Sequence, residues 1–530
     1  MCETILSNNN NTIYKKLLLL QTNNQKKINM YKEQKICLNP LVQQLKKDPK
    51  DFTKSDIIKY IEDNDIKILN FRYVAGDGRL KALNFVVSDS DYLNQILSYG
   101  ERIDGSSLFS FVEAGSSDLY VIPRFRTAFM DPFAELPTLC LLCSYYTKDG
   151  TPLETSPEYI LRKACNSFKE VTGGMEFNAM GELEYYVIGD KEDLFLATDQ
   201  KGYHEAGPFS KFEQFRAQTM FYIAQTGGNI KYGHSEVGNF TLGDKIYEQN
   251  EIEFLVTNAE DAANQLIIAK WIIRQLAYEY GLDVTFAPKI TVGKAGSGMH
   301  IHTQITKNGI NQYVENGQLS KVAKTAIAGF MQCAGSLTAF GNTNPTSYFR
   351  LVPHQEAPTS ICWGDRNRSV LVRVPLGWLS KNDMIANENP LEKPNAIDGS
   401  FKQTVEFRCP DGSADIYLLL AGLVVAARSG FEMNNALQFA EETYVNVNIF
   451  HAENKAKADS LKSLPTSCWE SAETLQQHRE IYERHGVFTP HMIDELIKKL
   501  KSFNDKDIRK ELDKNPNRML EIVKQFYHCG

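Results

Sequence analysis

Three short segments of this 530-residue chain alternate carboxylates with apolar residues, and they restrict its fold more than any other feature. They are "GELEYYVIG" (181–189), "NEIEF" (250–254) and "TVEFRCP" (404–410). Residues two apart share a face of an extended strand, so each segment has one charged face and one apolar face. A sheet with one packed face and one polar face is therefore predicted, although a solvated face is the usual interpretation of any single such strand.

Other patterns predict two domains of an α+β protein. The first has a helix, "KSDIIKYIEDNDI" (54–66), and strands divided by Gly, Asp and Pro signals, and it ends near residue 148. Longer helices follow at 259–281, 320–340 and 416–430. A chain of this length is expected to form one large core and a smaller companion.

The composition excludes several protein classes. Apolar residues make up 42% and charged residues 23% of the chain, as in ordinary globular proteins. A net charge of −7 without a basic stripe argues against nucleic acid and anionic membranes as partners. The run "LLLL" (17–20) is too short to span a bilayer, and the ten cysteines, including the close pair Cys140 and Cys143, show no disulfide or zinc framework. A cytoplasmic protein is expected, with residues 1–50 as an asparagine-rich extension that is disordered at its start.

Glycine and histidine residues in "GSGMHIH" (296–302) predict a loop followed by a strand that places His300 and His302 on one side. If this strand joins the acidic strands, an imidazole meets several carboxylates on one polar surface. Crowded carboxylates repel each other, and a divalent cation usually relieves that repulsion. Oxygen-rich ligation with a nitrogen donor favours Mg²⁺ or Mn²⁺ over zinc.

A cationic cluster accompanies the acidic one. Guanidinium groups give paired hydrogen bonds to phosphate and carboxylate, so arginines beside divalent metals indicate phosphoryl transfer. The glycine-rich "GKAGSG" (293–298) lacks the ending and the helix of a P-loop, so ATP would be bound in another way. The arginines in question are Arg350, Arg366, Arg368, Arg373 and Arg408.

Several ordered motifs carry a resemblance to a known family. From about residue 54 to its end the chain resembles bacterial-type glutamine synthetase, through "DGSS", "ELEYY", "HSEV", "NEIEF", "GSGMHIH", "RLVPHQEAP", "RNRSVLVRVP" and "VEFRCPDGSADIYL". The resemblance implies a small N-terminal β-grasp domain (51–148) and a large catalytic domain (149–530) with a curved antiparallel sheet and helices. It also implies a homo-oligomer of stacked rings, with each active site shared between neighbouring subunits.

The resemblance also assigns roles to residues. Glu184, Glu236 and Glu251 are similar to the ligands of one Mg²⁺ or Mn²⁺ ion, and Glu182, His300 and Glu406 to those of a second ion at the ATP phosphates. The remaining assignments are Gly296, Arg350 and Arg408 for the substrate amino acid, His302, Arg368 and Arg373 for ATP, and Asp104, Tyr203, Glu356 and Arg368 for catalysis.

The implied reaction joins L-glutamate and ammonium, with ATP as second substrate, through a γ-glutamyl phosphate. The alternatives are a γ-glutamyl-amine ligase and an inactive synthetase-like assembly. Ala295 stands where the family usually has asparagine, and Lys231, Arg124 and Asp415 are further departures. Two additional segments, 238–247 and 376–401, are predicted to be surface loops.

Overall fold

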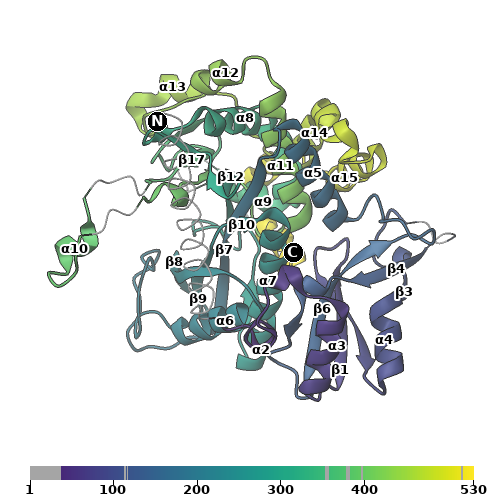
Figure 1. Ribbon diagram of the computed structural model, residues 1–530. Helices are drawn as coiled ribbons and strands as arrows, with labels where there is room; N and C mark the ends of the chain where they lie inside the picture. The colour runs from purple at the N-terminus through teal and green to yellow at the C-terminus, as the bar shows by residue number, and fades with distance from the viewer. Residues whose placement is uncertain are drawn as a thin grey trace, which may run out of the picture.

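The computed structural model describes residues 37–530, apart from 113–114, 116, 353–356, 378–381, 395–397 and 515–516. The smaller N-terminal domain lies beside a larger body that contains a long sheet and most of the helices (Figure 1). The predicted disorder at the start of the chain falls on residues 1–36, which lie outside the described residues. Among the described residues, no single helix is long and apolar enough to cross a membrane, and α11 with α12 meets that criterion only as a pair bent by 112°.

The small domain is built on a six-stranded sheet in the order β2-β1-β6-β4-β3, with β5 paired to β6. Apolar residues of β1 and β6 pack with α3 and α4 in a separate hydrophobic core. The one helix predicted here from sequence is confirmed as α3, and the four predicted strands as β1, β2, β4 and β6, whereas α4, β3 and β5 were not predicted. Their bounds are β1 (Ile68–Val74), β2 (Leu80–Val86), β3 (Glu101–Asp104), β4 (Asp118–Pro123), β5 (Phe129–Met130), β6 (Thr138–Tyr146), α3 (Lys54–Asp63) and α4 (Ser90–Tyr99).

A short helix precedes the predicted start of this domain at residue 51. Helix α2 (Pro40–Leu45) begins at the N-cap Asn39, and its Leu41 is completely buried in the small core. Helix α2 therefore packs with the small domain, and the limit between the extension and this domain at residue 50 stays a prediction. The apolar residues Leu41, Val42 and Leu45 have helical spacing, but six residues are too few to form a helix without the tertiary contact that buries them.

The large domain contains a ten-stranded sheet with the central order β16-β17-β18-β12-β7-β9-β8. The strands pair antiparallel, as predicted, except for β16 and β17 at one edge, which pair in parallel and make the sheet mixed. Both strands have only three residues. The connection 366–371 can span ~20 Å, so it is long enough to bring the chain from the end of β16 back to the level of its start, where a parallel β17 must begin. The bounds are β7 (Glu176–Asp190), β8 (Ile230–Leu242), β9 (Lys245–Phe254), β10 (Thr257–Asn258), β11 (Asp283–Thr285), β12 (Met299–Lys307), β13 (Ile310–Asn311), β16 (Trp363–Asp365), β17 (Val372–Val374) and β18 (Val405–Phe407), with β14 (Val314–Glu315) and β15 (Gln318–Leu319) as a separate pair.

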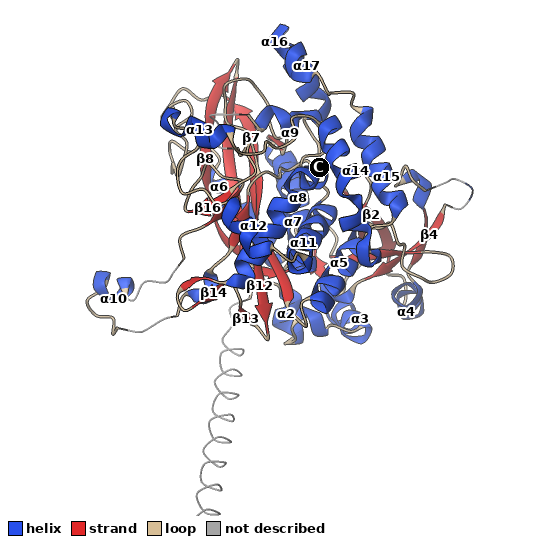
Figure 2. Ribbon diagram, turned by 90° about the horizontal axis from the view of Figure 1, so that it is seen from above, coloured by secondary structure: helices blue, strands red, loops and turns tan. Residues whose placement is uncertain are grey.

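Helices gather on one side of this sheet, as the view in Figure 2 shows. Helix α7 packs on β7, and α5, α8 and α11 pack on one another behind it to form the main hydrophobic core. The opposite, charged face of the sheet stays open for a site. The helices are α5 (Pro157–Val171), α6 (Glu213–Gln225), α7 (Ala259–Tyr280), α8 (Lys321–Gly341), α9 (Pro345–Arg350), α10 (Met384–Glu388), α11 (Ile416–Glu432), α12 (Ala436–Glu442), α13 (Lys455–Asp459), α14 (Cys468–Glu483), α15 (Pro490–Ser502), α16 (Ile508–Lys514) and α17 (Asn517–Phe526).

The two additional segments differ in structure. Helix α10, from the described part of the segment 376–401, lies away from the body (Figure 1), as predicted for a surface segment. Residues 238–247 instead extend β8 and β9 into a hairpin, in which Phe240 stacks on Tyr247 at 4.7 Å and is buried against the C-terminal helices. The prediction of a surface loop is wrong for this segment because Phe240 and Ile246 are buried in hydrophobic clusters, although Leu242 at its tip stays exposed.

Candidate active site

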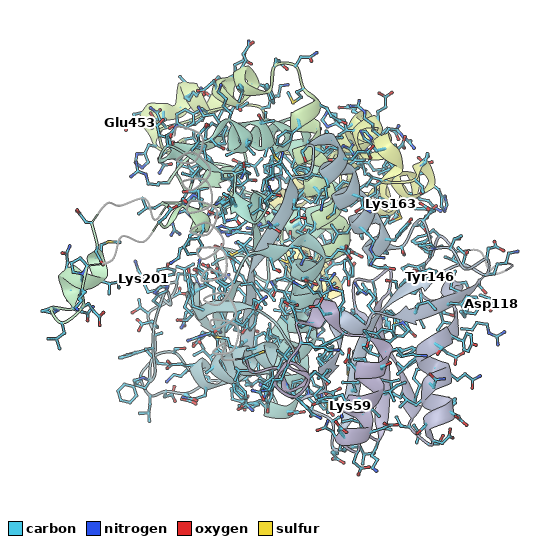
Figure 3. The ribbon with its side chains drawn as sticks, in the orientation of Figure 1. Lys59, Asp118, Tyr146, Lys163, Lys201 and Glu453 are labelled. Atoms are coloured by element: carbon cyan, nitrogen blue, oxygen red, sulfur yellow. The ribbon has the colours of Figure 1, made fainter. Side chains whose placement is uncertain are left out.

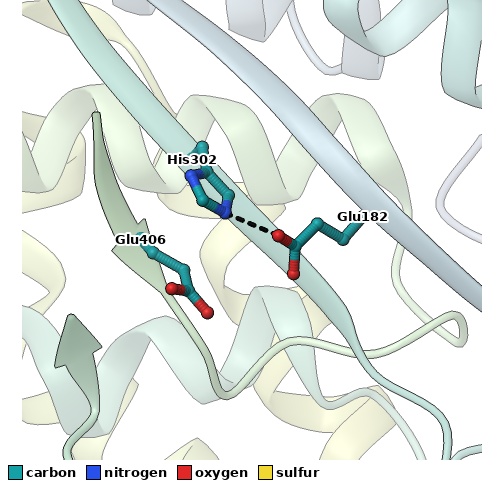
Figure 4. Close-up of side chains that lie close together, drawn as sticks. All are labelled: Glu182, His302 and Glu406. Carbon is teal, nitrogen blue, oxygen red and sulfur yellow. Dashed lines mark hydrogen bonds and ion pairs between the residues drawn. The ribbon is translucent and has the colours of Figure 1, made fainter. Parts of the chain in front are cut away.

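The three strands β7, β12 and β18 bring the first predicted metal set together. In the sheet register His300 pairs with Glu182, and His302 pairs with Glu406. His300 Nδ1 lies 2.8 Å from Glu182 Oε2 and 3.7 Å from Glu406 Oε1. His302 Nε2 lies 2.8 Å from Glu182 Oε1, as Figure 4 shows together with Glu406. Both histidines thus share one face of β12, as their spacing predicts.

The second predicted set lies on the next strands of the same face. Glu184 pairs with Glu251 across β7 and β9, and Glu236 comes from β8. Glu236 and Glu251 each offer a donor atom within 4.8 Å of the other and of His234. Glu184 accepts hydrogen bonds from the Gly298 amide (2.7 Å) and from Gln249 (3.0 Å), which fix its carboxylate beside this group.

Burial and neighbouring charges raise the pKa of Glu251, whereas the pKa of Glu182 is lowered. Burial raises the pKa of Glu251 well above its ordinary value, and the neighbouring carboxylates of Glu182 and Glu184 add to the rise. Burial also acts to raise the pKa of Glu182, but His302 and His300 outweigh it and hold that pKa well below its ordinary value. Removing the repulsion at Glu251 requires either a proton or a cation.

Arginines surround the remaining carboxylate of the first set. Glu406 is 1% exposed and receives Arg408 Nη1 at 2.5 Å and Arg373 Nη1 at 2.8 Å. Burial acts to raise the pKa of Glu406, whereas Arg408 holds it below its ordinary value. The register of β17 and β18, which pairs Arg373 with Glu406, aims both guanidinium groups into the site.

The glycine loop 293–298 packs against a third arginine, Arg350. A side chain at Gly296 would approach the Pro288 carbonyl oxygen to 2.6 Å and the Arg350 side chain to 3.0 Å, so this position excludes a Cβ atom. Arg350 donates from Nη1 to the Cys409 carbonyl at 2.8 Å and from Nη2 to His300 Nε2 at 3.3 Å. The small loop therefore lets the backbone approach a buried guanidinium beside the metal ligands.

These side chains line one cavity of about 510 Å³. Its lining includes all the predicted metal ligands and the predicted substrate and phosphate residues Gly296, Arg350, Arg408, His302, Arg368 and Arg373. Tyr203, which is predicted for the ammonium position, also lines it. Glu356 lies outside the described residues.

Asp104 does not line this cavity. It ends β3 at the edge of the small domain, where its exposed carboxylate accepts hydrogen bonds from Ser107 and Ser106 that lower its pKa. Its cross-strand partner Asp118 lies at the right of Figure 3. Lys201, which follows the cavity residue Gln200 in the chain, lies at the left. One chain therefore does not bring Asp104 to its own cavity.

Sequence reasoning missed several lining residues. Glu253 was recognised only as a strand carboxylate, yet it offers an oxygen within 4.8 Å of Glu182 and Glu251 and pairs with Lys231 and the Tyr232 hydroxyl. Its position two residues after Glu251, on the same face of the strand, was the sequence signal that could have identified it. Gln200 and Gln249 belong to no motif, and only the fold brings them to the cavity.

The donor chemistry fits a hard divalent cation. The groups that lie within 4.8 Å of one another consist of carboxylate oxygens with one imidazole each, or of carboxylates alone. Such sets suit Mg²⁺ or Mn²⁺, and thiols, which would favour softer ions, do not line the cavity among the described residues.

Two family models match the chain. The glutamine synthetase catalytic domain matches residues 154–516, and the glutamine synthetase beta-Grasp domain matches residues 65–148. The chain belongs to the glutamine synthetase family. A glutamine synthetase of Clostridium saccharobutylicum is 30% identical over 436 residues, which cover 81% of this chain and 90% of that protein.

Other relatives show how varied this glutamine synthetase family is. A 3-hydroxylaminophenol mutase of Cupriavidus pinatubonensis is 28% identical over 479 residues, which cover 84% of this chain and 94% of that protein. The cryo-EM structure of Plasmodium falciparum glutamine synthetase matches with a TM-score of 0.69 at 20% identity, covering 86% of this chain and 96% of that one. A structure titled apo GmaS matches with a TM-score of 0.67 at 18% identity, covering 85% and 95%. At these identities the two structures show the fold alone.

Proposed function

We propose that this chain is an ATP-dependent ligase that joins L-glutamate and ammonia to form glutamine through a γ-glutamyl phosphate. The observation that supports this most is the convergence of Glu182, His300 and Glu406 from three strands, next to Arg373 and Arg408. A cation site beside two guanidinium groups suits a reaction in which two anions, ATP and a carboxylate, must meet.

The side chains have the following proposed tasks. Glu182, His300 and Glu406 hold one Mg²⁺ or Mn²⁺ ion, and Glu184, Glu236 and Glu251 hold another. When bound, these ions neutralise phosphate and carboxylate oxygens and so reduce the repulsion between the substrates. Arg368, Arg373 and His302 orient the ATP phosphates, while Arg350, Arg408 and the backbone at Gly296 orient glutamate.

The same residues are proposed to support two chemical steps, formation of the acyl phosphate and transfer of the acyl group to ammonia. The γ-carboxylate oxygen of glutamate attacks the terminal phosphorus of ATP, and ADP leaves. Ammonium then gives a proton to the partner subunit's Asp104 near Tyr203, and the ammonia nitrogen attacks the acyl carbon, so that phosphate leaves. Glu356 is proposed to close the site against water, which would otherwise hydrolyse the acyl phosphate.

The remaining assignments belong to the same proposal. They are the domain limits 51–148 and 149–530, with the described residues 37–50 now joined to the small domain, a homo-oligomer of stacked rings, and a cytoplasmic location. The position of Asp104 away from the cavity of its own chain supports sharing of the site between subunits.

A second candidate is a γ-glutamyl-amine ligase. Aromatic rings line the proposed ammonium end, with Tyr203 stacked on His204 at 4.1 Å and His234 at 5.4 Å from Tyr203. Rings of this kind bind organic ammonium groups through their faces. The third candidate, an inactive assembly, is disfavoured because all the predicted ligands in the described chain line the cavity.

One assay separates the three candidates. ADP release is measured with ATP, Mg²⁺ or Mn²⁺ and L-glutamate, alone and with ammonium or a panel of alkylamines. Release that depends on ammonium supports glutamine formation, and release that depends only on an amine supports the second candidate. No release under any condition would overturn the proposal in favour of an inactive assembly.

A further inference from the structure

Two departures from the family pattern meet at one place in the structure. One is Ala295, which stands in the glycine loop 293–298 where an asparagine is usual. The other is the additional hairpin 238–247. The Ala295 side chain offers no polar atom, so contacts from outside the loop must hold this part of the cavity wall.

Gln200 contacts both Ala295 and the hairpin 238–247. Its side-chain Oε1 accepts a hydrogen bond from the Ala295 amide at 2.8 Å. Its Nε2 donates to the Asn239 carbonyl at 3.2 Å, and its backbone amide donates to the same oxygen at 2.8 Å. The backbone of Gln200 has φ 56°, a conformation that L-residues rarely adopt, and the two bonds to Asn239 hold it there. One side chain therefore ties the hairpin to the loop.

A tyrosine secures the other backbone group of Ala295. The Tyr186 hydroxyl donates to the Ala295 carbonyl at 2.9 Å. Gly238, at the base of the hairpin, leaves the room for this hydroxyl, since a Cβ atom at Gly238 would collide with it. Both the amide and the carbonyl of Ala295 are thus engaged by groups that contact the hairpin.

The residues on either side of Ala295 are held by the same surroundings. Lys294 pairs with Asp199 at 2.5 Å, and its ammonium lies 5.5 Å from the centre of the Phe240 ring in the hairpin. Gln249 accepts from the Gly238 amide at 3.1 Å and donates to the Gly296 carbonyl at 3.0 Å. The whole loop is therefore pre-organised before any substrate binds, which reduces the ordering cost of binding.

We propose that Gln200 is a positioning residue that fixes the glycine loop against the hairpin 238–247 and so sets the affinity for the amino-acid substrate. It acts through Ala295, whose amide it holds, and through the adjoining Gly296. The identification of that substrate as L-glutamate rests on the proposed function, whereas the fixing of the loop does not.

The decisive variant is Gln200→Met, which keeps the length of the side chain and removes both of its hydrogen bonds. Hydrogen exchange of the Ala295 amide in the ligand-free protein is expected to accelerate by about tenfold, the loss expected for one good hydrogen bond. The KM for L-glutamate is expected to rise by about tenfold, with kcat and the Kd for ATP changed by less than about threefold. Gln214→Met, on the exposed side of α6, is the matched control and is expected to change none of these.

Two more variants test the individual hydrogen bonds to Ala295. Gln200→Glu retains an oxygen that accepts from Ala295 and is expected to restore slow exchange of that amide. Tyr186→Phe keeps the buried ring and removes only the hydroxyl, so it is expected to raise the KM for L-glutamate as Gln200→Met does. Unchanged exchange at Ala295 in Gln200→Met, or faster exchange with an unchanged KM, would overturn the positioning role. If the wild-type chain shows no glutamate-dependent ADP release, the proposed function fails, while the exchange data still decide whether Gln200 fixes the loop.

Discussion

The two ends of the cavity are built in different ways. At the proposed metal end, Glu182, His300 and Glu406 stand on neighbouring central strands whose backbone register sets their spacing. At the proposed amino-acid end, Ala295 and Gly296 lie in a loop that is held by side chains from distant segments. A strand ligand is thus positioned by many backbone bonds, whereas a loop position depends on a few replaceable contacts. Changes at the first end are expected to abolish chemistry, and changes at the second to weaken binding.

The largest effect is expected from Glu406→Gln at the metal end. It removes a ligand charge while it keeps the side-chain volume, so kcat should fall by about 10³-fold or more, and Mn²⁺ binding followed by electron paramagnetic resonance should weaken. Glu279→Gln is the matched control, because it makes the same change on the exposed side of α7, outside the cavity lining, and it should retain wild-type activity. Similar losses in both variants would indicate a general loss of structure and remove the assignment of Glu406 as a ligand.

The second prediction tests whether the amino-acid and ammonium end is complete within one chain. Subunits carrying Asp104→Ala and subunits carrying Arg408→Ala should each be inactive alone. After dissociation and mixing in equal amounts, about a quarter of the shared sites should hold both intact residues, so about a quarter of wild-type activity should return. Mixed assemblies, demonstrated by native mass spectrometry, that stay inactive would show that the site is not shared.

A smaller effect is expected from Arg350→Lys, at the boundary between the two ends. Lysine cannot reproduce the forked donation to the Cys409 carbonyl and toward a substrate carboxylate, so the KM for L-glutamate should rise by about ten- to a hundredfold. Steady-state kinetics with ATP at saturation measure this change. Arg366→Lys, an exposed arginine outside the cavity lining, should leave the KM unchanged. An equal rise in both variants would indicate a general loss of structure.

The smallest effect is expected from Lys231→Gln. The Lys231 side chain is 40% exposed and pairs with Glu253, and ion pairs of this exposure contribute up to about 1 kcal/mol. The Kd for ATP, measured by isothermal titration, should therefore change by no more than about fivefold. A change of a hundredfold or more would place Lys231 among the residues that grip the nucleotide directly.

Sequence reasoning predicted the strand-built end well and the loop-built end poorly. Alternation in "ELEYY", "NEIEF" and "VEFR" and the spacing of His300 and His302 determine which side chains share a face, because the strand period is two whatever the neighbours are. Local periodicity, of two residues in strands and 3.6 in helices, also predicted the small sheet and the long helices. It failed for residues 40–45 and 238–247, whose burial depends on partners that are distant in the chain.

The sequence by itself thus determined the family, the secondary structure around the site and the set of charged residues that face one another across the strands. Only the tertiary structure decided that Glu253 joins this group, that Asp104 lies away from the cavity of its own chain, and that Gln200 and Tyr186 hold Ala295. The physical reason is the separation along the chain of the residues that interact. A local period fixes which side of a strand a residue occupies, but a contact between a loop and a hairpin far along the chain forms only when the whole core has packed.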